Sequence, residues 1–132
     1  MAVFFEPQNV NQWNILNEVK HVEHIEPFLA TKDMKIGDYL LLYIGQQNKQ
    51  YKPGVYAIGR IISNPYILRN RPTDYCNNKL SVDVEIVRID HHNPIINYYQ
   101  MKQMNKQYRR VHRLHVDGTK LKIILSENSL KS

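Results

Sequence analysis

Two dense apolar segments, Tyr39–Ile44 and Val55–Ile62, constrain the fold of this chain more than any other feature of its sequence. Neither segment alternates cleanly between apolar and polar residues, so we expect both to be strands buried on two faces. Such strands fit either a closed barrel or a sheet that is covered on both sides. The polar segment 45–54 between them, which ends in Pro53-Gly54, is long for a hairpin and is expected to project into solvent.

The apolar pattern elsewhere predicts further strands. Ala2–Phe5 is a short apolar strand closed by Pro7, and Leu80–Ile89 alternates in the way that a half-exposed strand does. Arg109–Val116 is expected to be a short basic strand or an irregular segment. Residues 64–79 are polar and basic, which predicts an extended loop.

Three helices are expected around these strands. The first begins at a cap provided by Asn9 or Asn11, carries apolar residues at helical spacing and ends before Pro27. Asn93-Pro94 combines a cap with proline at the first helical position, and Asp117-Gly118-Thr119 caps a last short helix. The sequence therefore predicts an α+β fold: a small, strongly curved or barrel-like mixed sheet with flanking helices.

The length and the cysteine content set the class of protein. A chain of 132 residues fits one domain, and we find no internal repeat or boundary, so we expect a single domain over residues 1–132. The single Cys76 cannot form an internal disulfide, and neither a signal peptide nor a membrane-spanning run is visible. We therefore expect a soluble cytoplasmic protein without a membrane partner.

Few residues are arranged for catalysis or for metal binding. No phosphate loop, dinucleotide fingerprint or serine elbow is present. Asp90-His91-His92 is the one cluster that suggests an acid–histidine site, and its place before a helix cap also fits an ordinary polar turn. His21/His24 and His112/His115 have the spacing of zinc ligands but are better interpreted as surface pairs. We expect no catalytic residue, no metal and no cofactor.

The net charge of +6 is concentrated in the second half of the chain. The basic residues there are Arg69, Arg71, Lys102, Lys106, Arg109, Arg110, Arg113, Lys120 and Lys122. This skew fits a polyanionic partner, chiefly nucleic acid, although a solvated basic surface without a partner would show the same skew.

Tyrosine is the commonest aromatic residue, with nine tyrosines against three phenylalanines. Six of them fall in the two apolar segments and the loops beside them: Tyr39, Tyr43, Tyr51, Tyr56, Tyr66 and Tyr75. A flat ring with a polar tip suits the stacking of an unpaired base, and core or rim packing is the alternative for any single tyrosine. Beside the basic skew, the set favours nucleic-acid binding.

Several blocks of this sequence resemble the EVE domain family, which belongs to the PUA-like superfamily and is related to YTH domains. The blocks are FFEP, NVNQW, KIGDYLLLYIGQQ, PGVYAIGRIISNPYI and VDVEIVRI, and together they cover roughly residues 3–90. The resemblance implies a PUA-like fold and a non-enzymatic module. It also implies recognition of a modified base in RNA or DNA, such as methylated adenine or cytosine, within an aromatic pocket.

The resemblance also implies where that pocket lies. Glu6 and Asn9 follow the first strand, where these domains place polar pocket groups, and Tyr43 matches a position at the pocket mouth. The next ring is expected from Tyr66 or Tyr75 in the loop after the second apolar strand. His24 falls in the segment where many relatives carry a second tryptophan. Trp13 matches a helical tryptophan of the family and is expected in the core.

Phosphate contacts are expected from arginines of the second half, namely Arg69, Arg71, Arg109, Arg110 and Arg113. The partner would be DNA or RNA, possibly with a modified base, and the sequence indicates no oligomeric state. Two other functions stay open: a small-molecule or protein interaction module on the same fold, and a hydrolase that uses Asp90, His91 and His92.

Overall fold

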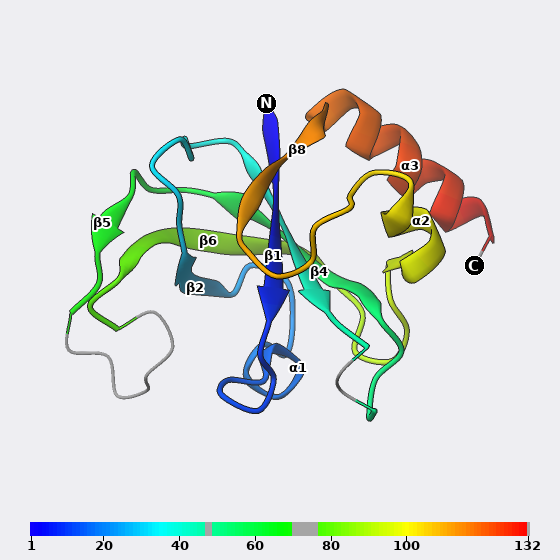
Figure 1. Cartoon of the computed structure of the whole chain (residues 1–132), viewed down its shortest axis with the longest axis horizontal. Helices are drawn as coiled ribbons and strands as arrows, with labels where there is room; N and C mark the ends of the chain where they lie inside the picture. The colour runs from blue at the N-terminus through cyan, green and yellow to red at the C-terminus, as the bar shows by residue number, and fades with distance from the viewer. Residues whose placement is uncertain (47–48, 70–76, 132) are drawn as a thin grey trace.

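The computed structural model describes residues 1–46, 49–69 and 77–131, and its strands belong to one sheet (Figure 1). In chain order the elements are β1 (Ala2–Gln8), α1 (Ile15–Glu18), β2 (Ile25–Leu29), β3 (Tyr39–Ile44), β4 (Gly54–Ile61), β5 (Tyr66–Ile67), β6 (Leu80–Ile89), β7 (Ile96–Asn97), α2 (Tyr98–Lys102), β8 (His112–Asp117) and α3 (Gly118–Lys131). The strand order is β2-β6-β4-β3-β1-β8, with β5 paired to β6 and β7 paired to β4. Because β1 and β3 run parallel and the other pairs antiparallel, the sheet is mixed.

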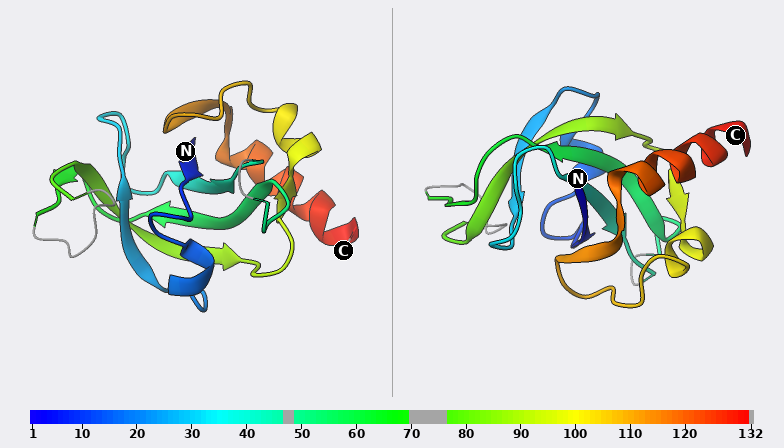
Figure 2. Two further views of the ribbon diagram at one scale, coloured as in Figure 1. Left: turned by 60° about the horizontal axis from the view of Figure 1, so that its bottom comes forward. Right: turned by 90° about the horizontal axis from the view of Figure 1, so that it is seen from above.

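The two apolar segments form β3 and β4, as predicted, and the sheet at this point is covered on both faces. Leu40 and Leu42 of β3 pack into one core with residues of α1, whereas Leu41 packs into a second core with Met101 of α2 and Leu121 of α3. Figure 2 shows α1 on one side of the sheet and α2 with α3 on the other. The lack of polar alternation in these strands follows from this double burial.

Closure into a barrel is not observed. The strand path ends at β2 on one side and at β8 on the other, and no pairing among the described residues joins these two strands. The structure therefore confirms a mixed α+β fold and not the barrel-like form of the prediction.

The first helix is much shorter than predicted. It has a single turn, and its cap is Asn14, whose side chain accepts a hydrogen bond from the Leu16 amide. Asn9 instead closes a separate turn, because its carbonyl accepts from the Gln12 and Trp13 amides. The predicted stop, Pro27, lies inside β2. Among the described residues, that strand pairs only with β6, so the missing amide of proline can face away from the ladder.

The second helix begins later than predicted. Its cap is Asn97, which forms a capping box with Gln100, and not Asn93. The residues directly after Pro94 extend instead and pair as β7 with the start of β4. A Cβ on Gly54 would lie 2.4 Å from the Pro94 Cβ, so this close approach of the backbones requires glycine.

The remaining predicted strands lie close to their predicted positions, whereas the last helix, predicted to be short, is α3 with 14 residues. β6 covers Leu80–Ile89, with Val82, Val84 and Ile86 buried on one side. The basic segment forms β8, and Asp117 caps α3 by accepting a hydrogen bond from the Lys120 amide. Of the loop predicted over residues 64–79, residues 64–69 and 77–79 are described, and they include the short strand β5. No helix in the described part of the chain has the length and apolar character needed to cross a membrane.

Candidate binding cleft

A cleft of about 690 Å³ opens where β1 and β3 end, and three tyrosines contribute to its lining. Tyr43 comes from the end of β3, Tyr98 from α2 and Tyr108 from the connection between α2 and β8. The Tyr43 and Tyr108 ring centroids are 5.2 Å apart, and those of Tyr98 and Tyr108 are 6.0 Å apart. Phe5 lies behind them, 5.0 Å from Tyr43. These spacings are those of packed aromatic pairs, so the rings support one another as one wall.

Tyr43 is held firmly in this wall. Its side chain is only 2% exposed, and the pairing of β3 with β4 shifts register between Leu42 and Tyr43. Burial, and then the neighbouring phenols of Tyr108 and Tyr98, raise the pKa of Tyr43 to about 12. The hydroxyl therefore stays protonated at neutral pH and is available as a hydrogen-bond donor.

Amide side chains supply the polar part of the lining: Gln8, Asn9, Asn11 and Gln46. The amide of Gln8 is unusual, because its oxygen and its nitrogen are both buried and neither has a hydrogen-bond partner among the described residues. Buried polar groups are normally paired, since an unpaired one costs about 1–3 kcal/mol. An amide presents a donor beside an acceptor, which is the pattern that the edge of a nucleobase also presents.

Asn9 has a structural task in the same loop. Its side-chain oxygen accepts a hydrogen bond of 3.1 Å from the Asn11 amide, and its carbonyl accepts from the Gln12 and Trp13 amides. These bonds turn the chain sharply after β1, and the turn places Asn9 and Asn11 beside Gln8 at the cleft.

Arg109 lines the cleft and brings a positive charge to it. The Gln107 side-chain oxygen accepts hydrogen bonds from the backbone amides of Arg109 and Arg110, which fixes the course of the chain directly after Tyr108. Both arginines have exposed side chains. Tyr108, Arg109 and Arg110 thus place one aromatic ring and two cations at consecutive positions of the chain.

Asn105 and His112 help to hold the connection between α2 and β8 in place. Asn105 is 7% exposed, and its nitrogen donates a 2.6 Å hydrogen bond to the Gln107 carbonyl. Its oxygen lies 2.8 Å from His112 Nε2, and His112 Nδ1 lies 2.8 Å from the Arg110 carbonyl oxygen. His112 in turn packs against Phe5, so the brace ties the connection to the aromatic wall.

Of the predicted pocket residues, Asn9 and Tyr43 line this cleft and the other described ones do not. Glu6 is fully buried in β1 and is absent from the lining. Tyr66 lies at the other end of the sheet, where β5 pairs with Ser81 and its hydroxyl donates to Asp83. It therefore does not face Tyr43, as the prediction required.

His24 does not line the cleft either. His24 precedes β2, where its Nε2 is 2.8 Å from the Glu26 carboxylate. Phe28 of β2 is buried in the core and packs edge-to-face on Trp13. Trp13 is therefore a core residue, as predicted. Tyr75 lies outside the described residues, as does Arg71.

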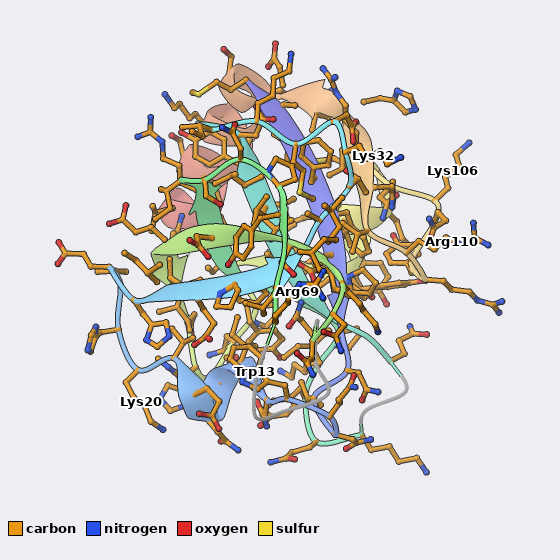
Figure 3. All side chains as sticks on the ribbon, turned by 90° about the vertical axis from the view of Figure 1, so that its left-hand side faces the viewer. Trp13, Lys20, Lys32, Arg69, Lys106 and Arg110 are labelled. Atoms are coloured by element: carbon orange, nitrogen blue, oxygen red, sulfur yellow. The ribbon has the colours of Figure 1, made fainter. Side chains whose placement is uncertain are left out.

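The predicted phosphate contacts divide into two regions. Arg109 and Arg110 are at the cleft or next to it, and Arg113 is exposed on β8. Arg69 follows β5, at the other end of the sheet from Tyr43. Figure 3 displays Arg110 at the margin of the molecule beside Lys106, with Arg69 apart from them.

Eight residues of the lining were not among the predicted site residues, namely Pro7, Gln8, Val10, Asn11, Gly45, Gln46, Tyr98 and Tyr108. The order Tyr108-Arg109-Arg110 is a usable signal, because it sets a stacking ring beside two cations. No comparable signal marks Gln8, whose importance depends on burial of its amide.

The Asp90-His91-His92 cluster is part of a turn. The Asp90 carboxylate accepts hydrogen bonds from the backbone amides of His92 and Asn93, and the Asn93 bond is the largest reason that the pKa of Asp90 is lowered. His91 Nε2 donates to the Val19 carbonyl at 2.7 Å. The acid and this imidazole are thus bonded to backbone groups, which leaves the hydrolase hypothesis without geometric support. The described residues contain no group of three His, Cys, Asp or Glu side chains that could hold a metal ion.

Comparison with protein families gives a match over most of the chain. A family model for the EVE domain matches residues 4–125, which includes every described element that lines the cleft. No curated protein matches this sequence.

Solved structures with the same fold include a hypothetical protein from Leishmania major, with a TM-score of 0.66 at 16% identity, covering 99% of this chain and 96% of that one. A crystal structure of a Pseudomonas syringae protein gives a TM-score of 0.64 at 16% identity, covering 96% of this chain and 99% of that one. An NMR structure of a Rhodopseudomonas palustris protein gives 0.57 at 16% identity, covering 100% and 96%. At such identities the likeness concerns the fold.

Proposed function

This chain belongs to the EVE domain family, and on that premise we propose that it is a non-enzymatic module that binds nucleic acid through the tyrosine-lined cleft. The cleft takes one unpaired base, modified or extruded from its strand. Arg109 and Arg110 contact the phosphates beside that base.

The observation that carries this proposal is the combination of groups around one cleft. Tyr98 and Tyr108 provide ring surfaces for stacking, with the buried Tyr43 packed behind them, and the Gln8 amide provides a buried donor and acceptor without a partner among the described residues. A volume of about 690 Å³ is within the usual range for ligand sites, ~300–1,000 Å³. A methyl group on the base would add apolar contact with the rings, while the amide reads the polar edge.

The charge of the lining favours a nucleotide over an uncharged small molecule. Arg109 is in the lining, Arg110 is next to it, and the described residues of the lining include no acidic side chain. Phosphate contacts position a nucleic acid, whereas base contacts specify it. The two tasks are divided here between the arginines and the wall of rings and amides.

The test is a titration of fluorescently labelled oligonucleotides at low and at moderate salt. Single strands, duplexes and strands with methylated adenine or cytosine are compared. We expect single strands to bind more tightly than fully paired duplexes. Arg109→Gln should weaken every complex about three- to tenfold and lower the slope of log affinity against log salt by about 1.

The matched control is Lys20→Gln, which removes the same charge. Lys20 lies on the opposite side of the view in Figure 3 from Arg110, so its loss should leave affinity nearly unchanged. The proposal is wrong if the protein binds no oligonucleotide at low salt. It is also wrong if Arg109→Gln and Lys20→Gln behave alike.

A further inference from the structure

A second hollow, of about 500 Å³, adjoins the binding cleft. The two share Gln46 and Tyr98, and the second is also lined by Lys52, Pro94 and Tyr99. Tyr98 therefore stands between two hollows and contributes to both. A ligand that extends beyond the first hollow could continue into the second without leaving the surface.

The aromatic wall continues in the same direction. The Tyr98 and Tyr108 ring centroids are 6.0 Å apart, and those of Tyr98 and Tyr99 are 5.9 Å apart. Consecutive side chains on a helix do not face the same way, so Tyr98 and Tyr99 present their rings in different directions. The capping box of Asn97 and Gln100 holds this first turn of α2 in place.

Of the three tyrosines Tyr98, Tyr99 and Tyr108, Tyr99 is the one whose aromatic side chain is not explained by packing in the fold. Its side chain is 75% exposed, so most of its ring contacts no other part of the protein. An exposed ring on a structured turn, beside a hollow, is a ready surface for stacking a base.

The charges around the second hollow suit a nucleic-acid backbone. Lys52 is in its lining and is exposed, and the Lys102 ammonium lies 5.3 Å from the centre of the Tyr98 ring. The described residues that line the second hollow, like those of the first, include no aspartate or glutamate. A phosphate between the two hollows would thus have cations near it and no opposing carboxylate in the lining.

We propose that the second hollow binds the nucleotide next to the base held in the first cleft, with its base stacked on Tyr99 and the connecting phosphate near Lys52 or Lys102. This inference rests on the proposed function of the first cleft. It makes the smallest complete ligand two nucleotides of a single strand. In this proposal Tyr99 strengthens the binding of the nucleic acid, and it does not select which base enters the first cleft.

The test compares Tyr99→Ala with the native protein on two kinds of short oligonucleotide. One is an ordinary trinucleotide; the other has the same phosphates but abasic sugars on both sides of the central base. Tyr99→Ala should weaken binding of the ordinary trinucleotide about tenfold or more, since stacking is lost. It should not change affinity for the abasic ligand, whereas Tyr99→Phe should bind both ligands as the native protein does.

Ile25→Ala is the matched control, since Ile25 is another exposed large side chain, 56% exposed, on the edge strand β2. It should not alter either affinity. If the native protein binds the central base but Tyr99→Ala loses nothing on the ordinary trinucleotide, the second subsite is wrong and the first cleft stands. If the native protein binds neither ligand, both proposals fall.

Discussion

Gln8 makes opposite contributions to folding and to the proposed binding. Its buried amide lacks a partner among the described residues, so an apolar side chain of similar size should suit the fold better. We expect Gln8→Leu to raise the free energy of unfolding by about 1 kcal/mol, measured by urea denaturation. The same variant should bind the base less tightly, since the donor and acceptor are gone.

The result for Gln8→Leu separates two roles. A loss of stability would mean that the amide serves the fold, and an unchanged affinity would mean that it does not read the base. Asn11→Leu is a useful comparison, because Asn11 also lines the cleft but is exposed.

Tyr43 gives the protein a stability change at alkaline pH. Its pKa is about 12 in the folded chain against about 10 unfolded, so between these values the folded chain keeps a proton that the unfolded chain has lost. The free energy of unfolding should therefore be unaffected below pH ~10 and fall by up to about 3 kcal/mol as the pH rises through 12. Denaturation across this range, with the phenolate absorbance recorded in parallel, measures both. In Tyr43→Phe this part of the fall should disappear.

At the scale of single residues, part of the cleft could be predicted from the sequence. Tyr43 could be placed because it ends an apolar strand, and Arg109 because it belongs to a basic run. Tyr108 carried a signal in the two arginines that follow it, whereas Tyr98 did not, since it joins the aromatic wall through a contact with Tyr108 that only the fold creates. Tyr66 was placed wrongly because proximity in the sequence says little about which end of a sheet a loop reaches.

Among the elements, α2 offers the clearest test, because two asparagines compete for the role of its cap. Asn97 caps it with both bonds of a capping box, whereas the Asn93 side chain makes no hydrogen bond in the structure described. Asn97→Ala should lower the free energy of unfolding by about 1 kcal/mol, and Asn93→Ala should change it little. Chemical denaturation of both variants gives the comparison. Equal losses would contradict the assigned cap.

Elements with a strong local pattern were predicted well, and those decided by distant partners were not. β3, β4 and β6 carry enough apolar residues to be placed almost to the residue. Asn93-Pro94 is a good helix start by local rules, yet pairing of Ile96 with Val55 extends the chain first. Pro27 stops a helix by the same rules, but it also fits an edge strand, and only the pairing with β6 decides between them.

For the whole molecule, the sheet places the first strand of the sequence beside the last one. β1 pairs with β3 on one side and with β8 on the other, and the Gly118 amide donates to the Met1 carbonyl. An open path from β2 to β8 could not be distinguished from a closed barrel by sequence, because closure depends on whether two distant edges meet. The apolar pattern of the strands is the same in both cases.

The position of β1 between β3 and β8 also sets the order in which the protein can be completed during synthesis. β1 is synthesised before its two neighbours in the sheet, and the second of them, β8, is made only after the other strands. Contacts of such long sequence separation slow folding, because a large loop must close before they form. Tyr108 and Arg109 lie shortly before β8, so their part of the cleft lining is synthesised after the rest. A nascent chain can thus hold a nearly complete β3–β4–β6 sheet while it still lacks the cleft that would bind a ligand.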